Sequence, residues 1–388
     1  MKRILIDVNS VVPYFALGKL SGIGRTTMEL VRALDAVEDI PFDIMLFSQN
    51  MKGIGAKDLN AHFNHRHIYL PYRNNTNHWV SNLHLKEMLT GYDLMHIPHN
   101  YAETKHADKC VVTLHDAMFF SYPEEAFKPE YCKKYYTQFA QQARAVITCS
   151  EASKKDIVEF MGIQPEKIHI TYWGYNKATF YPHPDRKCDY PFFLSTSCSL
   201  GRKNTMSVIR AFALFKQQGG EHHLSLVWRD PSPQVMDEIA LLNLTDCVHF
   251  YDSIPDEELA QLYSDATACF FPSLYEGFGF PVLESMASGT PVITCRNSSL
   301  PEVGGDAALY VEPYDIEAMT EIMLQLERMS SDDLESLRQE SLAQAGKLSW
   351  ERCALQTLEV YANCLKDKGG FYSDFQKSPL SGPTSKSV

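Results

Sequence analysis

One segment of the chain combines residues suited to bind an anion and several hydroxyl groups. Residues 273–291 read Ser-Leu-Tyr-Glu-Gly-Phe-Gly-Phe-Pro-Val-Leu-Glu-Ser-Met-Ala-Ser-Gly-Thr-Pro. The pattern predicts a glycine-rich turn and then a helix, with Pro281 at its first position and Gly289 at its carboxyl cap. Free backbone N–H groups at such a helix start, around Gly279 and Phe280, favour an anion such as a diphosphate.

Two carboxylates belong to the same segment. Glu276 lies in the turn, and Glu284 follows eight residues later in what we expect to be the first helical turn. Both are then able to project into one crevice, where acceptor-only carboxylates suit sugar hydroxyls. Taken singly, each residue also has a plainer explanation. Glu284 would complement the helix dipole, and Glu276 would be a solvated loop residue.

Shorter motifs elsewhere make the pattern specific. They are Ser-Gly-Ile-Gly-Arg-Thr-Thr-Met-Glu at 21–29, Val-Val-Thr-Leu-His-Asp at 111–116, Ile-Thr-Cys-Ser-Glu-Ala-Ser-Lys at 147–154, Arg-Lys-Asn at 202–204 and Ser-Trp-Glu at 349–351. With the Glu-x7-Glu segment they span most of residues 1–366, and they resemble, in the same order, the retaining glycosyltransferases of family 4. The resemblance implies the GT-B fold, in which two Rossmann-like domains face a cleft, and a nucleotide-sugar donor.

The resemblance also implies catalytic roles for four side chains: His115, Glu276, Lys203 and Arg202. Glu276 would bind the hydroxyls of the donor sugar, and Lys203 with Arg202 would neutralise the departing diphosphate. Fixed cations stabilise the charge that such a leaving group gains as the glycosidic bond breaks. His115 would contact the donor sugar without acting as a nucleophile, although a core or capping histidine explains that position too.

Donor-binding roles are implied for a second set of residues: Glu284, which would hold the ribose, Gly279, Phe280, Pro281, Gly22 and Gly24. Gly22 and Gly24 belong to the family's N-terminal glycine loop, and would bring backbone close to the diphosphate or the acceptor. They do not form a dinucleotide fingerprint, because the third glycine is missing. One position departs from the family pattern. Ser197 stands where many members carry an arginine, so either Arg202 substitutes or the diphosphate is held more weakly.

No Asp-x-Asp sequence occurs in the chain, so the usual means of holding Mg²⁺ or Mn²⁺ against a diphosphate is missing. We expect no metal and no cofactor beyond the nucleotide-sugar co-substrate. The ten cysteines form no Cys-x-x-Cys pair and are expected to be free thiols.

Alternating apolar and amphipathic segments must position these residues. In the first half, strands are expected at 3–8, 44–47, 94–97, 110–113 and 145–148, and helices at 24–37, 79–90, 129–143 and 151–161. After a Pro-rich and polar stretch at 174–191, strands are expected at 192–195, 224–227, 248–250, 268–271, 291–294 and 308–311. This βαβ rhythm predicts an α/β protein with parallel sheets.

The expected domains are an acceptor-binding domain at 1–180 and a nucleotide-sugar-binding domain at 190–350. By resemblance, a helix at 351–366 crosses back onto the first domain. The Gly-, Ser- and Pro-containing tail at 367–388 is expected to be disordered.

Composition limits the location and the partners. The net charge of −12 argues against nucleic acid as a partner, and no apolar run is long enough to span a membrane. We expect a cytoplasmic protein, with a possible peripheral membrane contact through the aromatic and basic residues of 129–144; a packed helix with a solvated basic face is the alternative. A His- and Arg-rich stretch at 62–84 is interpreted as a mobile loop on the acceptor side.

These expectations combine into one function. The chain is predicted to transfer a hexose, with mannose from GDP-mannose as the favoured donor, to a glycan or lipid-linked saccharide in surface polysaccharide synthesis, including lipopolysaccharide. Three alternatives stay open. They are a glycosyltransferase of the same fold that uses a UDP-sugar, a sugar-nucleotide epimerase and a non-catalytic subunit that binds a nucleotide-sugar.

Overall fold

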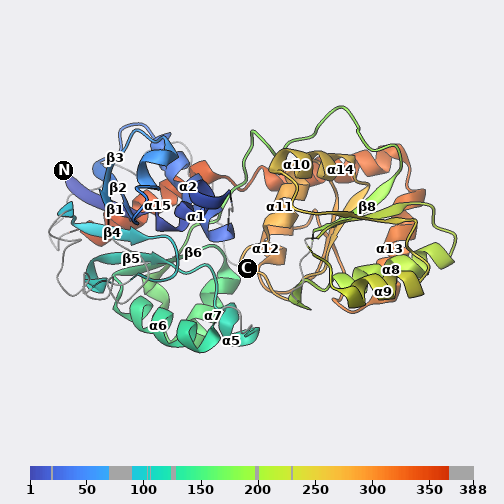
Figure 1. The fold of residues 1–388 in the computed structure, drawn as a ribbon, viewed down its shortest axis with the longest axis horizontal. Coiled ribbons are helices and arrows are strands. Elements are labelled where there is room, and N and C mark those ends of the chain that lie inside the picture. The colour runs from blue at the N-terminus through green and yellow to red at the C-terminus, as the bar shows by residue number, and fades with distance from the viewer. Residues whose placement is uncertain are drawn as a thin grey trace, which may run out of the picture.

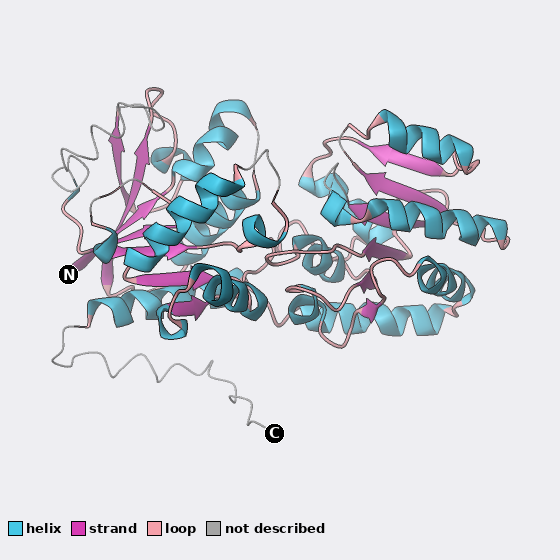
Figure 2. Ribbon diagram, turned by 90° about the horizontal axis from the view of Figure 1, so that it is seen from below, coloured by secondary structure: helices cyan, strands magenta, loops and turns pink. Residues whose placement is uncertain are grey.

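The computed structural model describes residues 1–18, 21–69, 90–102, 104, 106–123, 128–196, 201–228 and 230–366. Within these ranges the chain forms two parallel sheets that lie side by side, with the N-terminal half on the left of Figure 1. Figure 2 shows helices on both faces of the sheets. The predicted α/β class with two Rossmann-like domains is therefore confirmed.

The first sheet has seven strands in the order β3-β2-β1-β4-β5-β6-β7. The strands are β1 (Lys2–Asp7), β2 (Phe42–Gln49), β3 (Asn64–Ile68), β4 (Leu94–Ile97), β5 (Cys110–Thr113), β6 (Ala145–Thr148) and β7 (Ile168–Ile170). The five predicted strands are all present because each is a short apolar run. Ile4, Leu5 and Ile6, for example, are completely buried.

The two strands that the sequence analysis missed, β3 and β7, are the edges of this sheet. The interpretation of the His-rich stretch as a mobile loop is wrong for residues 64–68, which pair in parallel with β2. There His67 Nε2 donates a hydrogen bond to the carbonyl of Asn50 (2.9 Å), and His67 Nδ1 is hydrogen-bonded to Ser48 Oγ (2.8 Å). The remainder of that stretch from residue 70 onward lies outside the described residues.

The second sheet has six strands in the order β10-β9-β8-β11-β12-β13. They are β8 (Phe192–Thr196), β9 (His223–Val227), β10 (Val248–Tyr251), β11 (Ala268–Phe271), β12 (Val292–Thr294) and β13 (Leu309–Tyr310). All six were predicted. The strands of the first sheet end at Ile170 and those of the second begin at Phe192, and we keep the division of the chain at residues 180–190 as a proposal.

Helices connect the strands of both sheets. In the first half they are α1 (Val12–Leu17), α2 (Gly22–Asp35), α5 (Met118–Ser121), α6 (Pro129–Gln142) and α7 (Glu151–Met161). In the second half they are α8 (Thr205–Gln217), α9 (Pro233–Leu241), α10 (Asp256–Asp265), α11 (Phe280–Ala287), α12 (Leu300–Gly304), α13 (Ile316–Arg328), α14 (Ser331–Ala345) and α15 (Trp350–Leu365). Four predicted helices are found within two residues of their expected bounds, whereas the pattern at 79–90 falls almost wholly outside the described residues. None of the helices within the described ranges is long and apolar enough to cross a bilayer.

The last helix, α15, crosses back onto the first domain, as the resemblance implied; it lies beside α2 in Figure 1. A buried hydrogen-bond chain fastens it there. His96 on β4 contacts the Tyr361 hydroxyl through Nδ1 (2.6 Å) and Thr113 Oγ1 through Nε2 (2.8 Å). Burial, assisted by His99 and His115, lowers the pKa of His96 to about 3, so the imidazole stays neutral.

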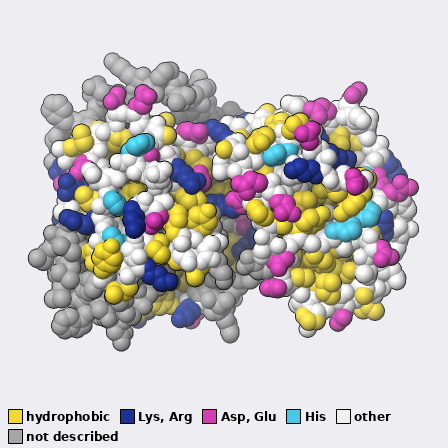
Figure 3. All heavy atoms as spheres, turned by 45° about the horizontal axis from the view of Figure 1, so that its top comes forward, with side chains coloured by type: hydrophobic (Ala, Val, Ile, Leu, Met, Phe, Trp, Pro, Cys, Tyr) yellow, Lys and Arg dark blue, Asp and Glu magenta, His cyan; other side chains and the backbone are white. Residues whose placement is uncertain are grey.

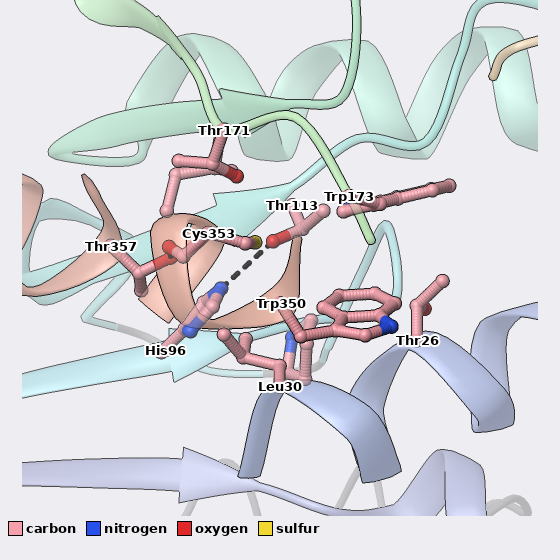
Figure 4. Close-up of a pocket in the computed structure, with 11 residues that line it drawn as sticks. Thr26, Leu30, His96, Thr113, Thr171, Trp173, Trp350, Cys353 and Thr357 are labelled. Atoms are coloured by element: carbon pink, nitrogen blue, oxygen red, sulfur yellow. Dashed lines mark hydrogen bonds between the residues drawn. The ribbon is translucent and has the colours of Figure 1, made fainter. Parts of the chain in front are cut away.

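A small cavity of about 10 Å³ lies beside this hydrogen-bond chain. Figure 4 shows Thr113, Thr171, Cys353 and Thr357 around it, with the His96–Thr113 bond drawn as a dashed line. It has room for about one water molecule. The contact between α15 and the first sheet is thus closely packed and polar at its centre.

Candidate functional site

The carboxyl end of β11 and the start of α11 form the centre of the candidate site. Gly279 caps α11 with φ 109°, and an added Cβ there would lie 3.1 Å from Leu300 Cδ2. Glycine is therefore required by backbone conformation. Because Gly279 is the cap, the helix begins at Phe280, and Pro281 is its second residue rather than its first.

This start places Glu284 one turn into α11, as the fifth helical residue. The expectation that it lies in the first turn is wrong. Its carboxylate is consequently too far along the helix for the dipole explanation, which applies to the first turn alone. The carboxyl cap of the helix is Ser288 rather than Gly289, and Gly289, with φ 78°, is the next residue. None of the hydrogen bonds found among the described residues engages the backbone N–H of Gly279 or Phe280.

Glu276, Lys203 and Arg202 meet at one point. Oε1 of Glu276 accepts hydrogen bonds from Lys203 Nζ (2.7 Å), Arg202 Nη1 (3.1 Å) and Ser273 Oγ (2.7 Å). The two cations follow β8 on the short helical turn Gly201–Lys203, and Glu276 follows β11. Strands β8 and β11 are neighbours where the strand order of the second sheet reverses, the place at which open α/β sheets bind ligands.

The electrostatics of this cluster favour an ionised Glu276. Burial alone would raise the pKa of Glu276, but the charges of Lys203 and Arg202 and the hydrogen bonds outweigh it, and the pKa lies below its ordinary value. The three side chains are between 11% and 15% exposed. Two cations face one carboxylate, so the cluster itself carries a surplus positive charge suited to a diphosphate.

The loop that carries Glu276 is held from the side by the start of α12. Ser298 Oγ accepts a hydrogen bond from the Glu276 backbone N–H (3.0 Å). Ser299 Oγ lies 2.9 Å from the Glu276 carbonyl and 2.7 Å from the Phe278 carbonyl, so it donates to this pair. These contacts fix the backbone of residues 276–278 before any ligand binds.

Glu284 belongs to a second cluster that joins the two domains. Its Oε1 lies 3.0 Å from Nη1 of Arg25 on α2, and Nη2 of Arg25 lies 2.7 Å from Asp256 Oδ1 on α10. Burial raises the pKa of Glu284 to about 7, although Arg25 lowers it. The cluster borders a cavity of about 670 Å³ that is lined by residues of both domains. The face of the molecule drawn in Figure 3 is hollowed between the two halves.

His115 and Asp116 follow β5 and face the second domain. His115 Nε2 lies 3.0 Å from the carbonyl of Pro98, which only accepts, so Nε2 carries the proton and Nδ1 is an acceptor. Burial lowers the pKa of His115 to about 4. Burial also raises the pKa of Asp116. An added Cβ on Gly277 would lie 2.7 Å from Asp116 Oδ2 and 2.9 Å from the His115 carbonyl.

The expected N-terminal glycine loop is instead the first turn of α2. The helix begins at Gly22, and Ser21 caps it by accepting a hydrogen bond from the N–H of Gly24 (3.0 Å). An added Cβ on Gly22 would meet nothing within 4 Å. The Gly24 amide is therefore already hydrogen-bonded inside the protein. The residue of this motif that contacts the opposite domain is Arg25, through Glu284 and Asp256.

Sequence reasoning missed most of the contacts between the domains. Ser150 and Ser153 at the start of α7 both donate through Oγ to the Gly277 carbonyl (2.8 and 3.1 Å). Glu302 on α12 accepts from the backbone N–H groups of Glu151 and Ala152 (2.7 and 2.8 Å). Ser150 also caps α7, which is all that its place before a helix indicates. Only the fold shows its second contact.

Two of these contacts use tyrosine. The Tyr275 hydroxyl donates to Asp156 Oδ2 on α7 (2.7 Å), and the Tyr172 hydroxyl donates to Glu302 Oε2 (2.9 Å). Burial and the neighbouring carboxylates raise the pKa of both phenols, so both remain protonated donors. The segment around Glu276 is therefore fastened to the first domain on both sides.

Some sequence predictions stay untested. Ser197 lies outside the described residues. No group of three His, Cys, Asp or Glu side chains close enough to hold a metal ion occurs within the ranges that the structure describes. The nine cysteines in these ranges are free, as expected.

Comparisons with known proteins agree with this architecture. Residues 20–178 match the model of Glycosyltransferase Family 4, and residues 182–347 match that of Glycosyl transferases group 1. O-antigen chain mannosyltransferase B of Escherichia coli is 27% identical over 380 residues, which is 88% of this chain and 96% of that protein. The MMP alpha-(1->4)-mannosyltransferase of Mycolicibacterium hassiacum is 32% identical over 231 residues, or 58% of this chain and 56% of that protein.

Solved structures share the fold at low identity. The Anabaena protein Alr3699/HepE, in complex with UDP and glucose, has a TM-score of 0.72 and 18% identity and covers 94% of this chain and 100% of its own. Sucrose-phosphate synthase from Thermosynechococcus elongatus has a TM-score of 0.70 and 21% identity, and the match covers 94% of this chain and 99% of that protein. The two family models adjoin and together cover most of the chain, and the motifs at the carboxyl edges of both sheets are those of the same family. The chain is a glycosyltransferase and belongs to the family 4, group 1 glycosyltransferases.

Proposed function

We propose that this glycosyltransferase transfers mannose from GDP-mannose, with retention of configuration, to a hydroxyl of a growing surface saccharide. Three of the relatives that it matches are named as O-antigen or MMP mannosyltransferases, and one of them aligns over nearly its whole length. The observation that carries the proposal is the cluster of Glu276, Lys203 and Arg202 within 3.1 Å beside the start of α11.

In this proposal the donor diphosphate lies between the two cations and the first N–H groups of α11. Lys203 and Arg202 then exchange part of their contact with Glu276 for the phosphate oxygens. Glu276 is freed to accept hydrogen bonds from the sugar hydroxyls. As the glycosidic bond breaks, the diphosphate gains negative charge, and cations already in place stabilise it without reorganisation.

Retention is proposed to proceed on one face of the sugar, with the leaving phosphate accepting the acceptor's proton. His115 is an unsuitable nucleophile, because Nε2 is bonded to Pro98 and the neutral ring is half-buried against Trp173, at 5.0 Å between ring centroids. We propose that it contacts the donor sugar without attacking it. The interdomain contacts at Gly277 and Glu302 would keep water away from the reacting bond.

We also propose a cytoplasmic enzyme whose helix α6 touches the membrane surface. Tyr131 and Tyr135 are 42% and 36% exposed, and Lys134 Nζ lies 5.2 Å from the Tyr135 ring centroid. Phe139, on the same helix, is buried in the core. The exposed aromatic rings beside lysines are typical of groups that lie at a lipid interface.

The donor is tested by thermal unfolding in EDTA, with GDP and UDP added separately. At about 100 times its dissociation constant, a nucleotide adds roughly 2.7 kcal/mol to the free energy of unfolding. We expect GDP to raise the midpoint by several degrees and UDP to raise it much less. A larger rise with UDP would support a UDP-sugar donor instead. No rise with either nucleotide, from folded protein, would contradict the diphosphate site.

A further inference from the structure

Arg25 connects the acceptor-side domain to a carboxylate of the donor site. It is the fourth residue of α2, directly after Gly24, and its side chain is 26% exposed at the interdomain cavity. One guanidinium nitrogen contacts Glu284 at 3.0 Å and another contacts Asp256 at 2.7 Å. The planar guanidinium thus bridges two carboxylates of the second domain from the first, which fixes its orientation.

Apart from Arg25, the ionisable side chains around Glu284 are carboxylates, tyrosines, or an arginine that is already paired with another residue. The titratable side chains that face it or line the cavity are Arg25, Glu29 and Arg32 on α2, Asp256, Glu257 and Tyr263 on α10, Tyr14 on α1 and Tyr175 after β7. Arg32 pairs with Glu29 at 2.9 Å. Among the described residues, Arg25 is therefore the cation in direct contact with Glu284.

A cation is needed here because Glu284 is buried. Its side chain is 7% exposed, and burial raises its pKa to about 7 even though Arg25 opposes that rise. Removing Arg25 leaves burial and Asp256, both of which raise the pKa further, so the carboxylate would become neutral over a wider pH range. Ionised carboxylates bind hydroxyls roughly twice as strongly as neutral acceptors do.

The contact also leaves Glu284 able to bind a ligand. The ion pair with Arg25 uses Oε1, and a carboxylate has a second oxygen whose lone pairs accept vicinal hydroxyls. Arg25 thus contacts Glu284 without occupying both carboxylate oxygens, and one oxygen is left for the ligand.

We propose that Arg25 is a positioning residue of the donor site, supplied by the opposite domain, which keeps Glu284 charged and oriented for the ribose of the nucleotide. Closure of the domains and binding of the nucleotide then stabilise each other. This inference rests on the proposed function, because it takes Glu284 to bind the donor.

The test is calorimetric titration of the full chain with GDP, and with UDP, at about pH 6.5 and about pH 8.5, on either side of the pKa of Glu284. Arg25→Gln should weaken nucleotide binding about tenfold at the lower pH, and the deficit should shrink at the higher pH, where the carboxylate ionises without help. Arg25→Lys, which keeps the charge, should recover most of the affinity. Arg32→Gln, on the same helix and cavity wall, is the matched control and should bind as the wild type does.

A double substitution separates positioning from a general loss of structure. Arg25→Gln added to Glu284→Gln should cost nothing more, because the charge to be supported is gone. Equal binding by Arg25→Gln and the wild type, tighter binding by Arg25→Gln, or a loss of the same factor at both pH values would each overturn the inference. Failure of the wild type to bind either nucleotide would instead contradict the proposed function.

Discussion

Replacing Lys203 with alanine should lower the rate of glycosyl transfer by about 10²–10³-fold, because removing one fixed donor to a developing charge has an effect of this size. Lys203 is one of two cations on Glu276, and its ammonium also lies 4.8 Å from the Phe271 ring centroid. Glu276 retains Arg202 and Ser273 as partners in the variant. The protein should therefore stay folded while the departing diphosphate loses one of its two neutralising charges.

The measurement is kcat and KM for the donor, with the unfolding midpoint of each variant alongside. Lys203→Arg should retain more activity than Lys203→Ala, because it restores the positive charge. Lys216→Ala is a matched control, since Lys216 lies on α8 of the same domain and bonds the carbonyls of Glu221 and His222. A Lys203→Ala enzyme with unchanged kcat would remove Lys203 from the proposed catalytic cluster.

Replacing Gly277 with alanine should impair catalysis through the contact between the domains. The new Cβ would lie 2.7 Å from Asp116 Oδ2 and 2.9 Å from the His115 carbonyl, closer than real Cβ contacts. Backbone cannot yield as a flexible side chain does, and the Gly277 carbonyl is also bonded by Ser150 and Ser153. The domains must separate by a fraction of an ångström or more, and a misplacement of about 1 Å costs roughly 10²-fold in rate.

The expected signature of Gly277→Ala is a large fall in kcat with a smaller fall in GDP affinity. In the proposed function the diphosphate is held by Lys203, Arg202 and α11 within one domain, and only the carboxylate of Glu284 depends on Arg25 across the interface. Gly346→Ala serves as its control. Gly346 has ordinary helical φ, and the nearest atom to an added Cβ is the Leu342 carbonyl at 3.4 Å. Wild-type turnover by Gly277→Ala would mean that the close approach of Gly277 to His115 and Asp116 is not part of the active arrangement.

The predictable parts of the fold are the elements whose own residues form a clear hydrophobic pattern. Central strands such as β5 and β11 are continuous apolar runs buried on both faces, and their bounds were predicted to the residue. The edge strands β3 and β7 of the first sheet escaped detection, whereas the edge strands β10 and β13 of the second sheet were predicted. In β3, Asn64, His65 and Arg66 are exposed, so no apolar pattern marks them.

Site residues were predictable only where they lie in a recognised motif and also carry a side chain suited to the expected ligand. The sequence pointed to Glu276, Lys203 and Arg202, and the structure brings them together. The partner of Glu284 was not predictable, because Arg25 lies 259 residues away and its motif was interpreted as a glycine loop. Glu302 was missed for a related reason. A glutamate in a short helix has no local feature that reveals a partner in another domain.

The most direct test of the proposed function is incubation of the wild-type protein with GDP-mannose and a saccharide acceptor in EDTA, measuring GDP release and the anomeric signal of the product by NMR. The proposal predicts GDP release that depends on the acceptor and an α-mannoside, since the donor is itself an α-linked mannose. A β-linked product would contradict retention. Free sugar or an epimer formed without an acceptor, or turnover of UDP-sugars alone, would contradict transfer from GDP-mannose.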